Sequence, residues 1–515
     1  MSPTNQNKTT EAAPTASGRA GAPIAPGRRT QILVIGGGLA GLAAAIRLRR
    51  EGRHDFLVLE RGDDVGGTWR DNTYPGAACD VPSHLYSYSF ALNPGWSRSF
   101  STQPEIQEYI TRVSRRYRVR DRHVFGCEVL AARWVEDSAR WEVETSRGLF
   151  VADVLVGAFG ALCEPSLPDI PGIDTFAGKI FHSARWDHDS DLEGLKVAVV
   201  GTGASAVQIV PAIAPRVSEL QVYQRTAPWV LPRMDRPYSA LERLACRYVP
   251  FYQRLVRGGI YWAHEAQAVA LAKRPALMRP VGAFARAKLR REVPDPALRR
   301  RLTPDYRAGC KRLLLSNTYY PTFRQDHVSL VTEGITEIRE KSVVTADGTV
   351  REVDALVLAT GFRVTDSPTY RRIRGKDGRS LGEVFDTVGR QCYKGTAVAN
   401  FPNMFLLVGP NTGLGHNSMI FMIESQVNYL VDALATMRRR RVRSLEVRAE
   451  AQEDFSRMLR HRLSRTVWNT GGCASWYLDK HGDNTTMWPG FSYEFRRITR
   501  RFDIDAYHVT TRGAQ

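Results

Sequence analysis

The sequence predicts an α/β protein in which one strand–turn–helix unit occurs twice. The first unit, "QILVIGGGLAGLAAAIRLRR", begins at residue 31, and the second, "LKVAVVGTGASAVQIV", begins at residue 195. In each, an apolar run typical of a buried strand meets a G-x-G turn and then a helix of small and apolar residues. A third observation is helical periodicity over about 236–305. We therefore predict two Rossmann-like dinucleotide-binding domains with a helical insertion.

Length and composition agree with a multidomain globular protein. The 515 residues exceed what one compact core holds, and 43% hydrophobic with 24% charged residues is an ordinary globular composition. No apolar run reaches the roughly 20 residues that span a bilayer, so we expect no transmembrane segment. Residues 1–29 are rich in Ala, Pro, Thr, Ser and Gly and lack the apolar core of a secretory signal, which predicts a disordered tail.

The chain is strongly basic, with 72 Lys and Arg against 53 Asp and Glu, or +19. Such a charge favours anionic partners or surfaces. The basic residues are spread through the second half and do not line one binding module, so we expect no nucleic-acid partner and a solvated basic surface. The seven cysteines are scattered without metal-ligand spacing, which predicts free thiols, no metal site and a reducing, cytoplasmic compartment.

The first turn carries the full G-x-G-x-x-G pattern. Gly36 permits the tight turn, Gly38 lets a pyrophosphate approach the helix N-terminus, and Gly41 lets the helix pack on the strand. Glu60 ends the next predicted strand, nineteen residues after Gly41, where a carboxylate accepts hydrogen bonds from ribose hydroxyls. A glycine-rich helix start without a ligand is the alternative.

The second turn repeats this order with Gly201, Gly203 and Ala206, in which alanine replaces the third glycine. Its following strand ends at Arg225, where the first unit has an acid. An acid would repel a 2′-phosphate, whereas an arginine pairs with it, so this unit is predicted to bind NADPH. Thr226 could add a hydroxyl contact or serve only the turn. Two different dinucleotides held together favour FAD as the ligand of the first unit.

Buried strands are predicted over 31–35, 56–59, 196–200 and 220–223, with returning strands at 150–161 and 351–362. These strands suggest an FAD domain made of two separate segments. The predicted division is an FAD domain over 30–165 and 366–515, a linker over 166–190, and an NADPH domain over 191–365.

The predicted linker contains "FAGKIFHSARW", in which Phe176, Gly178, His182 and Trp186 fit F-x-G-x-x-x-H-x-x-x-W. This pattern resembles the fingerprint of type I Baeyer–Villiger monooxygenases, flavoenzymes that insert oxygen beside a ketone carbonyl. The resemblance covers roughly residues 31–500. It implies that His182 and Trp186 fasten the linker when NADPH is bound. The alternative is that both are structural, with His182 hydrogen-bonded within the linker and Trp186 packed as an apolar side chain between the domains.

Further segments carry the resemblance. "GGTWRDNTYPGAACD" implies that Thr68 and Trp69 lie beside the flavin ring and that Asp80 lies near its reactive edge. "CKRLLLSNTYYPTF" implies that Lys311 lies by the NADPH phosphate and Arg312 over the flavin. "CASWY" implies that one tryptophan contacts the nicotinamide cofactor, and that residue is Trp476.

The resemblance implies a reaction in which NADPH, O2 and a ketone give an ester or lactone through a flavin C4a-peroxide. Arg312, held by Asp80, would stabilise the anionic nucleophile, although a surface arginine would also fit this position. The nearest alternative is an N- or S-oxygenating flavin-containing monooxygenase, which usually has another aromatic at the place of Trp186. A flavoprotein that only senses or binds NADPH is an alternative from another class.

Two regions remain open. The family has a helical insertion that helps wall the substrate cavity, which implies this role for 236–305, but an amphipathic basic stretch could instead lie on a membrane. The turn and helix at "GPNTGLGHNSMIFMIESQ" are expected on the flavin side, with three of the side chains near the substrate, although Met and Phe at helical spacing are more often core. The residues concerned are Met419, Phe421 and Met422.

Overall fold

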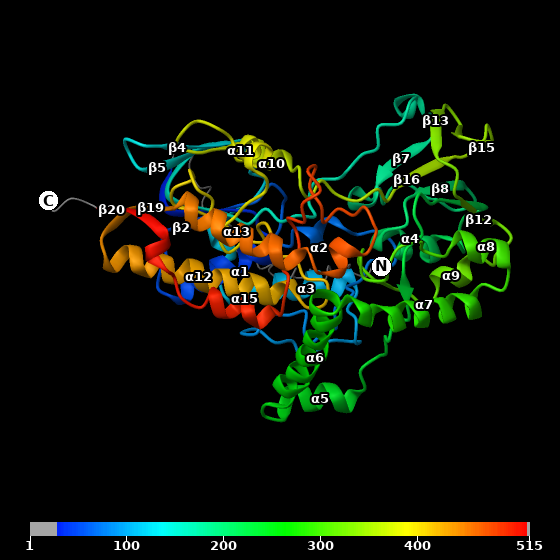
Figure 1. The fold of residues 1–515 in the computed structure, drawn as a ribbon, viewed down its shortest axis with the longest axis horizontal. Helices are drawn as coiled ribbons and strands as arrows, with labels where there is room; N and C mark the ends of the chain where they lie inside the picture. The colour runs from blue at the N-terminus through cyan, green and yellow to red at the C-terminus, as the bar shows by residue number, and fades with distance from the viewer. Residues whose placement is uncertain (1–27, 512–515) are drawn as a thin grey trace, which may run out of the picture.

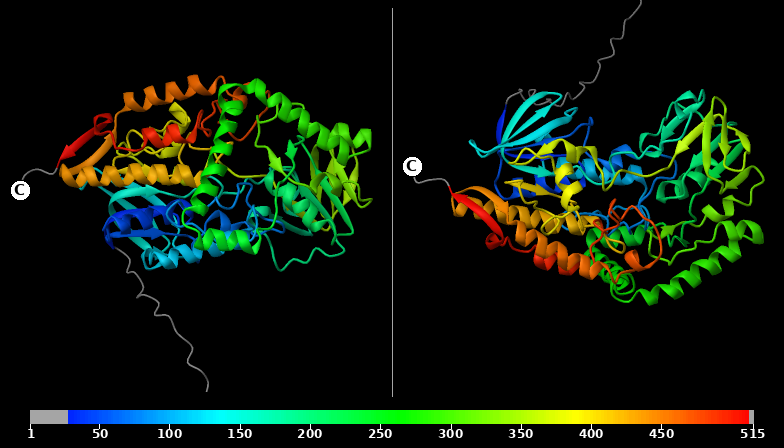
Figure 2. Two further views of the ribbon diagram at one scale, coloured as in Figure 1. Left: turned by 90° about the horizontal axis from the view of Figure 1, so that it is seen from below. Right: turned by 45° about the horizontal axis from the view of Figure 1, so that its top comes forward.

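A computed structural model describes residues 28–511 of the chain. Two lobes, each with its own sheet, lie side by side, and helix α6 (Tyr252–Ala268) runs at their junction (Figures 1 and 2). The tail predicted over 1–29 lies outside the described residues except for its last two, and the first strand begins at Arg29.

The first sheet has the order β17-β4-β5-β6-β1-β2-β3, and β18 also pairs with β6. Its central strands β6, β1 and β2 run parallel. Helices α1 (Leu39–Arg50) and α12 (Met419–Arg439) pack together within its core. The strands are β1 (Arg29–Ile35), β2 (Phe56–Leu59), β3 (His123–Val124), β4 (Val129–Val135), β5 (Arg140–Thr145), β6 (Gly148–Gly157), β17 (Ile373–Arg374) and β18 (Met404–Leu406).

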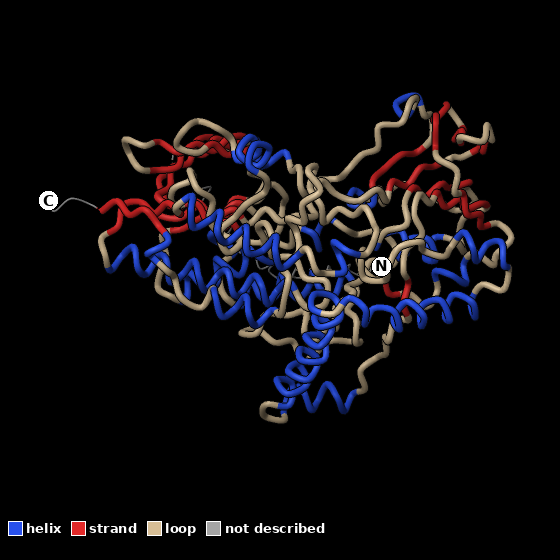
Figure 3. The backbone as a smooth tube through the Cα atoms, viewed as in Figure 1, coloured by secondary structure: helices blue, strands red, loops and turns tan. Residues whose placement is uncertain are grey.

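The second sheet is parallel throughout, in the order β12-β9-β8-β16-β7. Its alternating strands and helices bury apolar runs on both faces, as parallel sheets require. The two sheets are separate groups of strands in Figure 3. The elements are β7 (Lys179–His182), β8 (Lys196–Val200), α4 (Ala204–Ile213), β9 (Glu219–Tyr223), β12 (Val328–Val331) and β16 (Ala355–Leu358).

The predicted strands agree closely with the structure. The strands over 56–59 and 196–200 are confirmed to the residue, and those over 31–35 and 220–223 begin two and one residues earlier. The stretch 351–362 divides into β15 (Val350–Glu352) and β16. Part of the predicted linker is β7, which pairs with β16 along its whole length and forms the edge of the second sheet, with Phe181 and His182 buried.

The predicted insertion is helical. It consists of α5 (Ala240–Tyr248), α6, a π-helical turn (Val269–Lys273), a 3₁₀ turn (Pro275–Leu277), α7 (Met278–Glu292) and α8 (Pro296–Arg301). Pro250 separates α5 from α6, whereas Pro280 lies in the first turn of α7, where its missing N–H is not needed. The α5–α6 hairpin extends beyond both lobes (Figure 1).

Smaller elements complete the fold. The short sheets contain β10 (Val230–Leu231), β11 (Leu314–Leu315), β13 (Ile335–Arg339), β14 (Ser342–Thr345), β15, β19 (Val442–Val447) and β20 (Tyr507–Thr511). The other α-helices are α2 (Thr68–Asp71), α3 (Gln103–Arg116), α9 (Tyr319–Thr322), α10 (Pro368–Arg371), α11 (Leu381–Val388), α13 (Ala449–Leu463), α14 (Val467–Thr470) and α15 (Ser492–Ile498).

Candidate active site

The first glycine turn has the geometry that its pattern predicts. Gly36 has φ +104°, and a Cβ on it would lie 2.5 Å from the Ala158 carbonyl oxygen. A Cβ on Gly41 would overlap the Gly36 carbonyl. Helix α1 starts after Gly38 without a side-chain cap, so its first amides can bind an anion. These contacts explain why this turn needs glycine and what its helix can bind.

Glu60 lies directly behind this turn and is 5% exposed. Its carboxylate accepts hydrogen bonds from Gly37 N at 2.6 Å and Gly62 N at 2.8 Å, and it pairs with Arg70 at 2.8 Å. The carboxylate is therefore fixed at the end of β2. Oε1 accepts two of these hydrogen bonds and Oε2 accepts one, so Oε2 can accept one more.

The second turn has the same form. Gly201 has φ +117° and lies against Ala359, as Gly36 lies against Ala158. Helix α4 begins after Gly203, again without a side-chain cap, and a Cβ on Gly203 would meet no atom within 4 Å. Ala206 is fully buried, so the second turn accommodates a methyl group that the first excludes.

Two cations meet beside the second turn. Arg225 is exposed at the end of β9, and the Thr226 carbonyl accepts a hydrogen bond from Thr202 Oγ1 at 2.9 Å. Burial, and then the Arg225 charge, lower the pKa of Lys311, whose Nζ lies 5.1 Å from the Tyr306 ring centre. Across residues 28–511, no carboxylate lies within ion-pair distance of either cation. The arrangement suits a multiply charged anion.

Asp80 and Arg312, which are 232 residues apart, form an ion pair. Arg312 Nε donates to Asp80 Oδ2 at 2.6 Å, and the side chains remain 32% and 29% exposed. Burial opposes the charge on Asp80, but the Arg312 charge and hydrogen bond outweigh it and hold the Asp80 pKa below its usual value. The Asp80 charge raises the pKa of Arg312. Both groups are thus charged and oriented, with surface left for a ligand.

The segment before Asp80 folds back over the first turn. Thr68 and Trp69 open the short helix α2, and a Cβ on Gly38 would lie 3.6 Å from Gly67 Cα. The Trp69 indole donates to the Tyr86 hydroxyl at 2.9 Å. Thr68 and Trp69 therefore lie near the first turn, and their place beside the flavin ring stays a prediction.

The same segment contacts the second lobe, which sequence reasoning missed. Thr73 Oγ1 lies 2.7 Å from His188 Nε2, the Tyr74 hydroxyl donates to Gln208 Oε1 at 3.0 Å, and Gln208 Nε2 donates to the Ala78 carbonyl at 3.0 Å. These contacts join the segment before Asp80 to helix α4 and to the residues that follow β7.

The fingerprint residues support the second sheet. Phe176 and His182 are buried, and Gly178 and Trp186 are part-exposed. Phe176 packs over Gly178, where a Cβ would also overlap the Asp354 carbonyl. His182 Nδ1 accepts from Ala184 N at 3.1 Å, so Nε2 carries the proton and donates to the Gly361 carbonyl at 3.0 Å. Burial lowers the pKa of His182, which keeps it neutral. Trp186 meets Phe181 edge to face at 4.9 Å.

Cysteine pairing is a correction to the sequence prediction. Cys310 and Cys473 form a disulfide, with Cα atoms 6.2 Å apart, whereas five other cysteines are free thiols. The bridge joins the residue before Lys311 to the segment that carries Trp476, which is 46% exposed. The two cysteines are 163 residues apart in the sequence, so this pairing could not be predicted before the fold was known.

The insertion reaches this region through the end of α6. Glu265 is 1% exposed and bonds Asn417 Nδ2 at 2.8 Å and the amide of Ser492 at 3.1 Å, with His416 Nε2 at 3.3 Å. These bonds outweigh burial and lower the Glu265 pKa. The neighbouring His264 bonds the His416 carbonyl at 2.8 Å, and burial lowers the pKa of its ring. Sequence patterns gave no sign of this cluster.

The three candidate substrate residues differ in exposure. Met422 has no exposed surface, and Phe421, 8% exposed, stacks on Tyr261 at 5.1 Å. Met419 is part-exposed at the start of α12. Only Met419 retains substantial surface for a ligand, and the other two belong to the core.

Comparisons with known proteins agree with this geometry. Residues 33–269 match the family model described as pyridine nucleotide-disulphide oxidoreductase. A Baeyer–Villiger monooxygenase of Streptomyces coelicolor is 52% identical over 480 residues, which cover 93% of this chain and 92% of that protein. The chain belongs to the type I Baeyer–Villiger monooxygenase family. The predicted family and enzyme class are thereby confirmed.

Solved structures of this Baeyer–Villiger family share the fold. Cyclohexanone monooxygenase from Rhodococcus sp. Phi1 bound to NADP+ superposes with a TM-score of 0.84 at 29% identity, covering 95% of this chain and 100% of that one. OTEMO in complex with FAD and NADP gives 0.85 at 28% identity, covering 93% and 99%. The predicted pair of Rossmann-like domains is confirmed. No helix within the described range is long and apolar enough to cross a membrane.

Proposed function

We propose that this monooxygenase binds FAD at the first turn and NADPH at the second and converts a ketone to an ester or lactone. One oxygen atom of O2 enters the bond beside the carbonyl, and the other leaves as water while NADPH is oxidised. OTEMO, which has the same fold, holds the same pair of dinucleotides. A cytoplasmic location stays a prediction.

The residues at each turn fit these cofactors. Uncapped amides of α1 and α4 suit a pyrophosphate, whereas α5 and α11 have their first amides capped by serines. Buried Glu60 suits ribose hydroxyls, and the cations Arg225 and Lys311 suit a 2′-phosphate. Gly203 leaves open space in front of its helix.

Bound flavin supplies the activated oxygen, and bound NADPH supplies the hydride. Asp80 fixes the Arg312 guanidinium through Nε, while Nη1 lies 3.5 Å from the Leu414 carbonyl. Nη2 has no hydrogen-bond partner in residues 28–511, so it can donate to a negative oxygen. A fixed cation stabilises both an anionic nucleophile and the negative charge that develops on the carbonyl oxygen.

The observation that carries this proposal is the partly exposed Arg312–Asp80 pair, which links the segment folded over the first turn to the residue after Lys311. An N- or S-oxygenating reaction transfers oxygen to a soft nucleophile and does not need the anionic form. A permanent cation at the reacting oxygen therefore favours ketone oxidation. His182 and Trp186 lie in the support of the second sheet, so we assign them to domain coupling and not to the chemistry.

The test is product analysis of the FAD-loaded enzyme and of Arg312→Ala with a panel of ketones, NADPH and air. We expect a mass gain of one oxygen in the wild type and a loss of about 10²- to 10³-fold in ester or lactone formation in the variant. Flavin reduction is measured separately by stopped flow. Exposed Arg363→Ala is the matched control and should retain activity.

A thioether substrate separates the two reaction classes. Its oxidation should suffer less than ketone oxidation in Arg312→Ala once the reduction rate is taken into account. Near wild-type ester formation by that variant would show that Arg312 is not the catalytic arginine.

A further inference from the structure

The α5–α6 hairpin carries apolar side chains that the rest of the described chain leaves uncovered. Leu241, Leu244 and Tyr248 recur at i, i+3 and i+7 along α5 and are 78%, 50% and 70% exposed. Leu255, on α6, is 72% exposed. Proteins that stay in water rarely expose a contiguous apolar patch of this kind. The apolar tip, as we name it, comprises Leu241, Leu244, Tyr248, Val249, Phe251 and Leu255.

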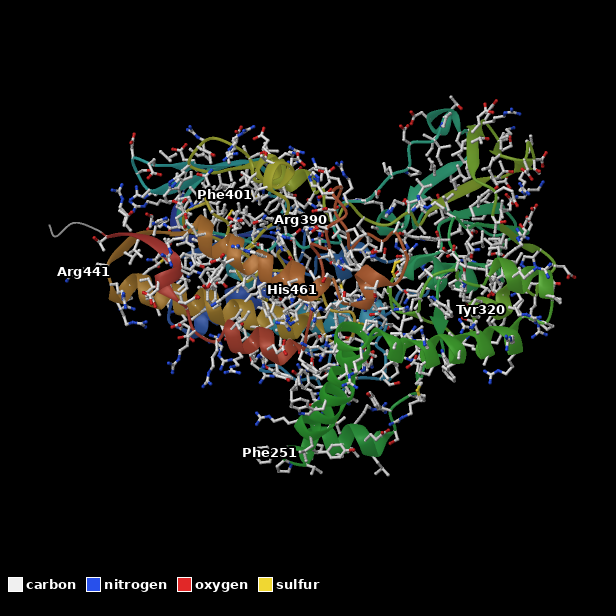
Figure 4. All side chains as sticks on the ribbon, in the orientation of Figure 1. Phe251, Tyr320, Arg390, Phe401, Arg441 and His461 are labelled. Atoms are coloured by element: carbon white, nitrogen blue, oxygen red, sulfur yellow. A yellow bond between two sulfur atoms is a disulfide. The ribbon has the colours of Figure 1, made fainter. Side chains whose placement is uncertain are left out.

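The apolar tip is convex. The hairpin extends away from both lobes in Figure 1, and Phe251 marks its outer end in Figure 4. Phe251 has φ +62° and is 68% exposed, in the turn between the two helices. A convex end of this form can enter a soft surface, whereas a protein partner would need a matching hollow.

The unpaired charges around the apolar tip are all positive. Arg243, Arg247 and Arg254 are exposed, and throughout residues 28–511 no carboxylate pairs with them. The Arg254 guanidinium lies 5.8 Å from the centre of the Phe251 ring. The hairpin's exposed part has one acid, Glu242, which is already paired with Arg236. Apolar and basic side chains on one short helix pair are typical of helices that lie in a membrane interface.

The base of the hairpin is fixed to the body of the protein. Arg257 donates to the Leu85 carbonyl at 3.0 Å, Gln253 Nε2 donates to the Asn93 carbonyl at 2.6 Å, and Glu265 is buried among hydrogen bonds. The exposed end is therefore presented by a fixed scaffold, as an anchor requires.

We propose that the apolar tip inserts into the interface of an anionic lipid bilayer and that Arg243, Arg247 and Arg254 bind the lipid phosphates. A second copy of this chain is a poorer occupant, because it would bring two unpaired basic tips together, each on a chain of net charge +19. Anionic lipids complement these charges, and acyl chains cover the leucines. Tyr248 and exposed Trp262 suit the headgroup level.

The test is flotation of the full-length, FAD-loaded protein with vesicles of phosphatidylcholine alone or mixed with phosphatidylglycerol. We expect binding to the anionic vesicles that weakens as salt rises. Leu241→Ser, Leu244→Ser and Leu255→Ser combined should weaken binding about tenfold or more. The matched control combines Leu130→Ser, Leu149→Ser and Leu167→Ser, at exposed leucines elsewhere, and should bind as the wild type does.

The charge arm combines Arg243→Gln, Arg247→Gln and Arg254→Gln. Its control removes three exposed, unpaired arginines elsewhere, at Arg300, Arg438 and Arg440, and so has the same net charge. Flavin content shows that each variant folds. Equal vesicle binding by tip and control variants would overturn the proposal. So would a change from dimer to monomer in the tip leucine variant with unchanged vesicle binding, since the tip would then be a subunit interface.

Discussion

At the first glycine turn the neighbouring strand ends at a buried carboxylate, whereas at the second it ends at an exposed arginine. The backbones differ little: the residues before the two helices have φ/ψ of −74°/−169° at Gly38 and −77°/−168° at Gly203. The turn glycines, Gly36 and Gly201, have φ +104° and +117°. The same main-chain form therefore carries opposite charges at one equivalent place.

The comparison separates two tasks. We propose that main-chain amides at the helix start bind the pyrophosphate in either turn, because every dinucleotide has one. In the proposed assignment the side chain at the strand end selects the ribose, with Glu60 binding free hydroxyls and Arg225 binding a phosphate. Packing also differs, because the third position is a glycine without room for a methyl group in the first turn and a buried alanine in the second.

The largest expected effect is at this third position. Gly41→Ala forces a methyl group onto the Gly36 carbonyl, so we expect the free energy of unfolding to fall by about 3 kcal/mol, with loss of flavin. Ala206→Gly, the matched change in the second turn, should cost only about 1 kcal/mol. Denaturant unfolding and flavin content measure both. A cost of Gly41→Ala as small as that of Ala206→Gly would show that the first turn can accommodate the methyl group after all.

A smaller effect should separate the cofactors. Arg225→Ala removes one charged partner of the proposed 2′-phosphate, so KM for NADPH should rise by an amount equivalent to about 1.5 to 3 kcal/mol, while KM for NADH changes little. Glu60→Gln should leave both constants unchanged and weaken flavin retention. Steady-state kinetics measures KM for NADPH and for NADH in each variant. Equal effects of Arg225→Ala on the two KM values would remove the basis for naming NADPH.

Much of this comparison was predictable because it is local in sequence. Strand, turn and helix lie within about 30 residues, so Gly36 to Glu60 and Gly201 to Arg225 could be found from spacing alone. The family resemblance predicted that Asp80 holds Arg312, and in the structure Arg312 Nε lies 2.6 Å from Asp80 Oδ2. Their roles in the reaction stay predictions.

The remaining features depend on segments that meet only after folding. Thr73 contacts His188 across 115 residues, and Glu265 holds Ser492 across 227 residues. Neither pair has a local pattern. The disulfide was missed for the same reason, and the odd number of cysteines favoured free thiols instead. The exposed face of the hairpin could not be predicted either, because helical periodicity does not tell which face of a helix is covered by a neighbouring element.

The smallest effect concerns a support that the second turn has and the first lacks. His182 donates to Gly361, two residues beyond Ala359, against which Gly201 packs, whereas no histidine bonds the corresponding residues 158–160 in the described structure. Burial lowers the pKa of His182, so the folded state binds its proton less readily than the unfolded state. Stability from the neutral ring is present above the unfolded pKa, near 6.5, and is lost as pH falls below it.

We therefore expect the free energy of unfolding to fall by about 1 kcal/mol more in the wild type than in His182→Gln when pH is lowered from about 7.5 to 5.5. Protonation of Nδ1 removes the hydrogen bond that it accepts from Ala184 N. Glutamine does not titrate in this pH range, so the variant loses no hydrogen bond when pH is lowered. His461→Gln, at an exposed histidine on α13, is the control and should follow the wild-type curve (Figure 4). Other buried histidines, such as His84 with a pKa lowered to about 4 by burial, titrate equally in all three proteins, so the difference between the curves isolates His182. If the three curves coincide, the support of the second turn does not depend on the charge of this ring, and the two turns differ in their ribose partners and packing alone.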